Sequence, residues 1–174
     1  MLVKAFSGLA RELYEVKLVI VGPDEGYLLS LKKLTADLKI DNKVIFTGPL
    51  YEKNKLEAYI DADIFVLPST YETFPIAVME ALACNIPVIL TKCCGIADII
   101  DGKSGYAVDL NISQMKDAMV GILTDSVLAR KFGEAGRKMV VERFNWKQIS
   151  GTLEQIYLEA KTRQLREYID FHPL

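Results

Sequence analysis

Histidine is almost absent from this sequence, since the only one, His172, lies in the C-terminal tail. The residues therefore give little support to a mechanism or metal site that needs histidine, and we expect His172 to be a tail residue. Cysteine is also scarce: Cys84, Cys93 and Cys94 are odd in number, and their spacing is not that of a zinc site. We expect three free thiols in a reducing compartment.

An excess of charge of one sign is missing too. The chain has 23 acidic and 21 basic residues, and a formal net charge of -2, so the composition does not favour a nucleic-acid or membrane-surface partner. No uninterrupted apolar run is long enough for a membrane span, because the most apolar stretch, residues 74–90, is broken by two prolines, Glu80 and Asn85. The first residues run directly into a helical pattern without a signal peptide, so we expect a cytoplasmic protein.

What the sequence does contain is a regular alternation of helix and strand patterns. Short runs rich in β-branched residues predict strands, and apolar residues at helical spacing predict helices. Strands are expected at 17–21, 43–46, 64–67, 88–90 and 105–108. Helices are expected at 2–13, 27–38, 53–60, 75–84, 113–123, 126–144 and 146–169.

This alternation predicts an α/β fold with a doubly wound, Rossmann-like parallel sheet. The length of 174 residues fits a single domain over 1–174, in which 146–174 form a C-terminal helix and tail. Ligands of such sheets bind beyond the carboxyl ends of the strands. The glycine-rich loops of dinucleotide-binding proteins and P-loop enzymes are both absent, which argues against those two classes.

The loop and helix after the third predicted strand contain the most informative residues. The helix that opens at Pro75 is apolar except for Glu80. A buried carboxylate needs a partner, which is either an internal Lys or Arg, backbone donors, or a ligand that bears hydroxyl groups. The helix N-terminus favours a phosphate, and Glu72 lies just before it. Two carboxylates on either side of an anion site suggest a diphosphate with a sugar at each end.

The same stretch resembles a known family. Glu72 and Glu80 match the Glu-x7-Glu motif of family 4-like (group 1) retaining glycosyltransferases, which have the GT-B fold. The neighbouring segments 67–69, 79–81 and 87–89 are also similar to that family, as are the loop 95–105 and the junction 143–146. This resemblance covers nearly the whole chain and implies the C-terminal, donor-binding half of a GT-B enzyme.

The resemblance also implies residue roles. Glu80 would bind the ribose hydroxyls of the nucleotide, and Glu72, the expected catalytic residue, would hold the donor sugar near the reacting carbon. The backbone at Thr73 and Phe74 would contact sugar or phosphate. The base would lie between two further loops, formed by Gly22 and Pro23 and by Thr47, Gly48 and Leu50. The reaction implied is transfer of a mannosyl- or glucosyl-type group from a nucleoside diphosphate sugar to a glycan or lipid-linked acceptor, with retained configuration and without a metal or cofactor.

The chain departs from the family pattern at two places. Thr73 and Pro75 stand where the family usually has glycines, and Pro75 removes a backbone donor. The family's domain also begins with a central strand followed by an Arg and a Lys that neutralise the diphosphate, and these have no counterpart here. Lys92 is a candidate substitute, although a surface role is the simpler interpretation. We therefore expect an incomplete sheet, self-association through it, and no sugar transfer without an N-terminal acceptor-binding domain.

Three alternatives stay open from the sequence. The chain is a non-catalytic nucleotide-sugar-binding module or subunit, a related GT-B enzyme such as an epimerase or a glycogen-synthase-like transferase, or a generic Rossmann-like domain in which the two glutamates are structural. Nucleotide binding separates the last of these from the others.

Overall fold

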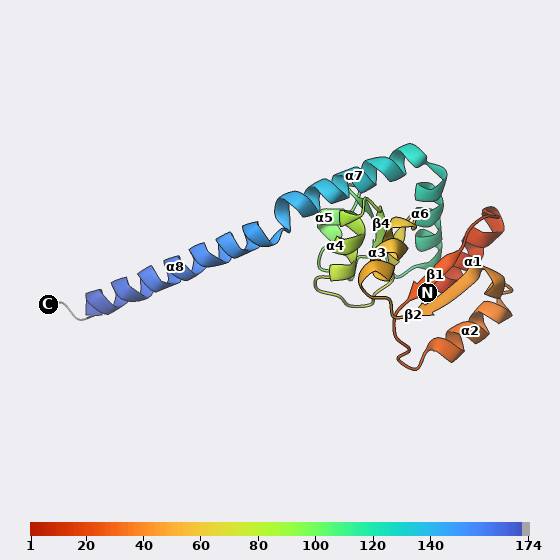
Figure 1. Cartoon of the computed structure of the whole chain (residues 1–174), viewed down its shortest axis with the longest axis horizontal. Coiled ribbons are helices and arrows are strands. Elements are labelled where there is room, and N and C mark those ends of the chain that lie inside the picture. Colours follow the sequence, from red (N-terminus) through yellow and green to blue (C-terminus); the bar gives the residue numbers. More distant parts are fainter. Residues whose placement is uncertain (172–174) are drawn as a thin grey trace. The chain divides into compact units, whose positions relative to one another are not determined.

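The computed structural model describes residues 1–171, in which helices and strands alternate as far as β5 (Figure 1). The strands are β1 (Leu18–Val21), β2 (Val44–Gly48), β3 (Phe65–Leu67), β4 (Val88–Thr91) and β5 (Gly105–Val108). The helices are α1 (Leu2–Glu12), α2 (Leu28–Asp37), α3 (Glu52–Ile60), α4 (Ile76–Ala83), α5 (Ala97–Ile100), α6 (Ile112–Thr124), α7 (Ser126–Arg143) and α8 (Trp146–Phe171), with a 3-10 turn, η1, at Asp41–Lys43. His172, the expected tail residue, lies outside the described residues.

All the strand pairs are parallel, which confirms the predicted α/β class with parallel sheets. Within the described residues, β1 and β2 form one sheet, and β3, β4 and β5 form another in that order. Val19 lies opposite Ile45 in the smaller sheet. In the larger sheet, β4 is the central strand, with Phe65 opposite Val88 on one side and Leu90 opposite Ala107 on the other.

Strand β4, at the centre of the larger sheet, is a largely apolar run because it is buried on both faces. Its four residues are all buried. Because side chains alternate along a strand, Ile89 faces the core formed with α1 and α6, while Val88 and Leu90 face the other side. Helix α4 also packs against β3 and β4, and it is apolar apart from Glu80. The larger sheet is thus covered on both faces, as expected for parallel strands.

The smaller sheet is covered less completely. Leu18, Ile20 and Phe46 pack against the core that contains α1. The alternate side chains face outward: Val19 is 48% exposed and Ile45 is 44% exposed. Strands β1 and β3 are not paired with each other anywhere in the described part of the chain. This arrangement agrees with the expectation of a sheet that lacks a strand between them.

A second compact unit begins at Lys138, inside α7. It includes α8, which is a continuous helix of 26 residues (Figure 1). None of the helices in the described residues is both long enough and apolar enough to span a lipid bilayer. The prediction of one domain over the whole chain stays a prediction.

Candidate functional site

The loop after β3 holds Glu72 at the carboxyl edge of the larger sheet. The N–H of Glu72 donates to the carbonyl of Cys93 at 3.4 Å, and the N–H of Gly95 donates to the carbonyl of Glu72 at 2.8 Å. The Thr91 hydroxyl also donates to the Ser69 carbonyl. These bonds join the loop after β3 to the loop after β4, so the backbone of Glu72 is fixed from both sides while its side chain is half-buried.

Helix α4 starts directly after this loop. Sequence reasoning places Pro75 at the first helical position, whereas in the structure Pro75 is the N-cap and the helix runs from Ile76. The carbonyl of Pro75 accepts the N–H of Val78 at 3.1 Å, which closes the first turn. A proline has no N–H to leave unpaired at this end of a helix. The first turn of α4 is therefore adjacent to the Glu72 loop.

Glu80 lies in the second turn of α4, and both of its carboxylate oxygens have partners. Lys55 Nζ lies 2.6 Å from Oε1, and the Tyr59 hydroxyl donates to Oε2 at 3.0 Å. The Glu80 side chain is 35% exposed and that of Lys55 is 42% exposed. Of the partners considered for this carboxylate, the structure shows the internal lysine together with a tyrosine.

Tyr59 is held by its surroundings as well as by Glu80. Its ring packs against the Phe65 ring of β3, with centroids 5.8 Å apart. Burial raises the pKa of the Tyr59 hydroxyl, and the hydrogen bond to the Glu80 carboxylate raises it further. The phenol therefore stays protonated around neutral pH and acts as a donor to Glu80.

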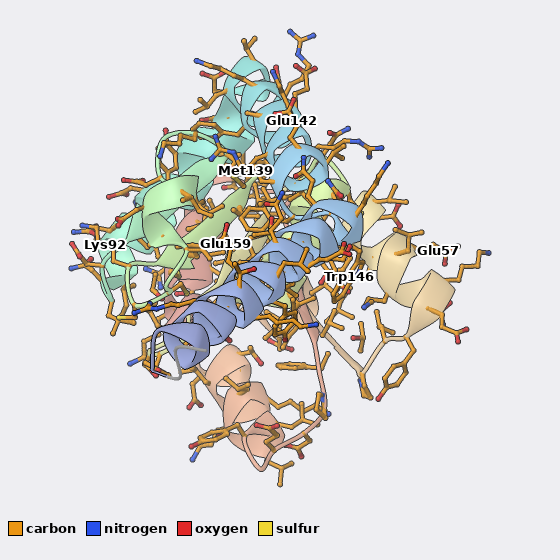
Figure 2. The ribbon with its side chains drawn as sticks, turned by 90° about the vertical axis from the view of Figure 1, so that its left-hand side faces the viewer. Glu57, Lys92, Met139, Glu142, Trp146 and Glu159 are labelled. Atoms are coloured by element: carbon orange, nitrogen blue, oxygen red, sulfur yellow. The ribbon has the colours of Figure 1, made fainter. Side chains whose placement is uncertain are left out.

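Lys55 and Tyr59 are the site residues that sequence reasoning missed. Both come from α3, four positions apart, and this spacing places their side chains on one side of the helix. That spacing is the only signal the sequence offers, because nothing in it indicates that this side of α3 meets α4. The other side of α3 has an exposed ion pair between Lys53 and Glu57 at 3.1 Å, with Glu57 labelled in Figure 2.

The loops after β1 and β2 form a second group of predicted site residues. The N–H of Gly22 donates to the carbonyl of Gly48 at 3.1 Å, so these two loops lie side by side. Gly48 has a φ of 72°, which favours glycine. The Thr47 hydroxyl donates to the Gly48 carbonyl at 2.8 Å. Pro23 is exposed and Leu50 is half-buried.

Three further residues that the sequence singles out, Thr73, Phe74 and Lys92, lie at the surface. Thr73 and Phe74 are exposed at the surface between Glu72 and α4. Lys92, labelled in Figure 2, forms an ion pair with Asp109 at 3.1 Å. Its ammonium group is thus engaged at the surface, which agrees with the simpler interpretation of this residue.

A cavity lies at the opposite edge of the sheets, near the strands' amino ends. Val16, two residues before β1, and Asp63, two residues before β3, both line it. The ends of α1 and α6 complete the wall, through residues that include Leu13 and Ile122.

The comparisons with known proteins agree with this geometry. A family model described as "Glycosyl transferases group 1" matches residues 1–139. The chain belongs to this family. The match confirms the resemblance seen in the sequence, and the fold matches the C-terminal domain of GT-B glycosyltransferases. The domain is therefore of the kind that binds nucleotide-sugar donors in the group 1 family.

Two known proteins are similar over most of this chain. N-acetyl-alpha-D-glucosaminyl L-malate synthase of Bacillus anthracis is 31% identical over 160 residues, which are 91% of this chain and 41% of that protein. Sucrose-phosphate synthase from Thermosynechococcus elongatus is 26% identical with a TM-score of 0.79, over 92% of this chain and 42% of that one. The chain thus spans about two fifths of the length of these two proteins.

One solved structure corresponds to a C-terminal domain alone. It is the C-terminal domain of a group 1 glycosyltransferase from Francisella tularensis, which is 25% identical with a TM-score of 0.74. The similarity covers 83% of this chain and 78% of that domain. This chain therefore corresponds to the C-terminal part of its relatives.

Proposed function

We propose that this chain is the nucleotide-sugar-binding domain of a retaining hexosyltransferase. Glu80 accepts hydrogen bonds from the ribose hydroxyls of a nucleoside diphosphate, and Glu72 holds the hydroxyls of the donor sugar beside the reacting carbon. The observation that supports this most is the pair of carboxylates at one carboxyl edge: Glu72 in a loop fixed by Cys93 and Gly95, and Glu80 in the adjoining helix. Membership of the group 1 family supports the same assignment.

The remaining contacts follow from this placement. The diphosphate lies near the first turn of α4, where the helix dipole is positive. The backbone of Thr73 and Phe74 contacts the sugar or the phosphates. The base lies against the two loops that meet through Gly22 and Gly48, with Pro23, Thr47 and Leu50 around it.

The reaction we propose is transfer of a mannosyl- or glucosyl-type group to a glycan or lipid-linked acceptor, without a metal or cofactor. In this scheme the chain works together with an N-terminal acceptor-binding domain, in the cytoplasm. The length of the relatives supports the need for a further domain, since this chain spans less than half of them. The names of these relatives differ: one is an N-acetyl-alpha-D-glucosaminyl L-malate synthase and the other a sucrose-phosphate synthase.

A second candidate is a non-catalytic nucleotide-sugar-binding module. The observation that favours it is the engagement of nearby lysines, since Lys55 is paired with Glu80 and Lys92 with Asp109. Stabilisation of a diphosphate leaving group by cations is a large catalytic contribution, and both lysines are already paired with carboxylates here.

Calorimetry with the chain itself tests the binding function common to both candidates. We expect UDP, GDP or ADP to bind, and the matching nucleotide-sugar to bind more tightly. Turnover of that donor, measured with the chain alone and then with a supplied N-terminal domain, separates a transferase from a module. Absence of binding to all three nucleotides would contradict the proposed function.

A further inference from the structure

The carboxylate of Glu80 is held at both oxygens by one helix. Lys55 and Tyr59 approach from successive turns of α3, at 2.6 Å and 3.0 Å. Each partner binds a different oxygen, so rotation of the carboxylate breaks at least one of the two contacts. Glu80 is therefore fixed in one orientation before any ligand arrives.

In this arrangement the Glu80 carboxylate can still accept further hydrogen bonds. An ionised carboxylate has about four lone-pair positions on its two oxygens. Lys55 and Tyr59 occupy one position on each oxygen, so one position on each remains. The side chain is 35% exposed, so solvent reaches it. Two neighbouring hydroxyl groups can each donate one hydrogen bond, and so fill the one lone-pair position that remains on each oxygen.

The two partners differ in what they contribute. The Tyr59 ring is fixed against Phe65 at a centroid distance of 5.8 Å, so its hydroxyl has little freedom. Lys55 contributes a positive charge, which compensates the charge of Glu80. An uncompensated carboxylate repels an approaching diphosphate, and the repulsion is large where solvent is partly excluded. Lys55 therefore makes a carboxylate compatible with an anionic ligand.

We propose that Lys55 and Tyr59 are positioning residues for recognition of the ribose diol of a nucleoside diphosphate. They orient and neutralise Glu80, and they remain bound to it when the ligand is present. This inference rests on the proposed role of Glu80 as the ribose-binding residue. It adds that α3, which contributes none of the residues expected from the sequence, determines how strongly the site distinguishes a ribose from a sugar without hydroxyls.

The test compares two ligands on one set of variants. UDP, GDP and ADP are each titrated beside the analogue that lacks both ribose hydroxyls, and the ratio of the two dissociation constants measures recognition of the diol. The ratio is determined for the wild-type chain, Glu80→Gln, Lys55→Met, Lys55→Arg and Tyr59→Phe. Lys53→Met is the matched control, because Lys53 lies on the same helix and, among the residues that the structure describes, forms its ion pair with the exposed Glu57. Circular dichroism and thermal melts show that each variant is folded.

We expect the wild-type chain to bind the ribonucleotide at least about tenfold more tightly than its analogue, since one hydrogen bond to a charged group contributes about a tenfold gain in affinity. Glu80→Gln, Lys55→Met and Tyr59→Phe should each reduce the ratio by about threefold to tenfold. Lys55→Met should also weaken binding of the analogue, because the uncompensated charge of Glu80 repels the diphosphate that both ligands carry. Lys55→Arg should retain most of it, and Lys53→Met should leave it unchanged. A merely structural role would lower the affinity for both ligands equally and keep the ratio constant.

The results that would contradict the role of α3 differ from those that would contradict the role of Glu80. If Glu80→Gln reduces the ratio while Lys55→Met and Tyr59→Phe do not, the role of α3 is wrong and the ribose-binding role of Glu80 stands. If the wild-type ratio is close to one, or if no nucleotide binds, the proposed role of Glu80 is wrong and the inference falls with it. If Lys55→Met instead tightens nucleotide binding, Lys55 competes with the ligand, and the positioning role is overturned.

Discussion

Gly95 lies against the backbone of Thr73 so closely that a Cβ atom at Gly95 would be 2.5 Å from the Thr73 carbonyl oxygen. This contact and the hydrogen bond from the Gly95 N–H to the Glu72 carbonyl hold the loop after β3 beside the loop after β4. The position of Glu72 therefore depends on the absence of a side chain at Gly95.

Gly95→Ala should displace the Glu72 loop and destabilise the fold by about 1–3 kcal/mol, because the obstructing atom belongs to the backbone and cannot rotate away. Thermal unfolding measures the change. Gly121→Ala is the control, since a Cβ there meets open space within α6 and should stabilise the chain by about 0.5–1 kcal/mol. Equal melting temperatures for the two variants would contradict the account of this loop.

Strands β1 and β3 each have a partner strand on one side, but in the described part of the chain they do not pair with each other. This leads to a prediction about association. Exposed strand edges and apolar side chains such as Val19 and Ile45 favour pairing with other chains. We expect concentration-dependent self-association in analytical ultracentrifugation, reduced by Val19→Lys and unaffected by Leu29→Lys, a change at an exposed residue of α2.

A polypeptide that supplies an N-terminal domain and a strand between β1 and β3 should remove this association and raise the melting temperature, because the backbone N–H and C=O groups on the free edges of these two strands gain hydrogen-bond partners. A chain that is monomeric at all concentrations, and whose melting temperature does not respond to the added polypeptide, would show that the gap between the two sheets is not a binding site.

The three free thiols should differ in reactivity. Cys93 is exposed, whereas Cys94 is buried and Cys84 is half-buried. Burial raises the pKa of the Cys84 and Cys94 thiols, so at a given pH a smaller fraction of each is the reactive thiolate. Ellman's reagent at mildly alkaline pH should label one thiol quickly and two slowly, and Cys93→Ser should remove the fast phase. Three equal rates would contradict the burial of Cys94.

The sequence predicts where the centre of each main helix and strand lies, but it does not predict which other elements each one packs against. Val19, Ile45, Phe65, Ile89 and Ala107, which mark the five predicted strands, all lie in strands. The short helix α5 and the turn η1 were missed, because three or four residues give no periodic pattern. Pro75 is a cap instead of a helical residue, which is the usual one-residue error at a boundary.

In the candidate site, too, some residues can be predicted from the sequence and others depend on packing. Glu72 and Glu80 are recognised from their spacing and surroundings, and the loops at Gly22 and Gly48 from their place after strands. The partners of Glu80 depend on how α3 packs against α4, which no local pattern encodes. Lys55 and Tyr59 therefore become visible only in the folded chain.

The central claim is that Glu80 binds the nucleotide and Glu72 binds the donor sugar, and one set of titrations tests it most directly. The best of UDP, GDP and ADP, and the corresponding nucleotide-sugar, are titrated by calorimetry into the wild-type chain, Glu80→Gln and Glu72→Ala. Glu80→Gln should weaken binding of both ligands by about 1–3 kcal/mol, because a charge-assisted hydrogen bond to ribose is lost. Glu72→Ala should leave the nucleotide affinity unchanged and weaken only the nucleotide-sugar. Unchanged affinity in Glu80→Gln, or an equal loss for both ligands in Glu72→Ala, would contradict the division of roles between the two carboxylates.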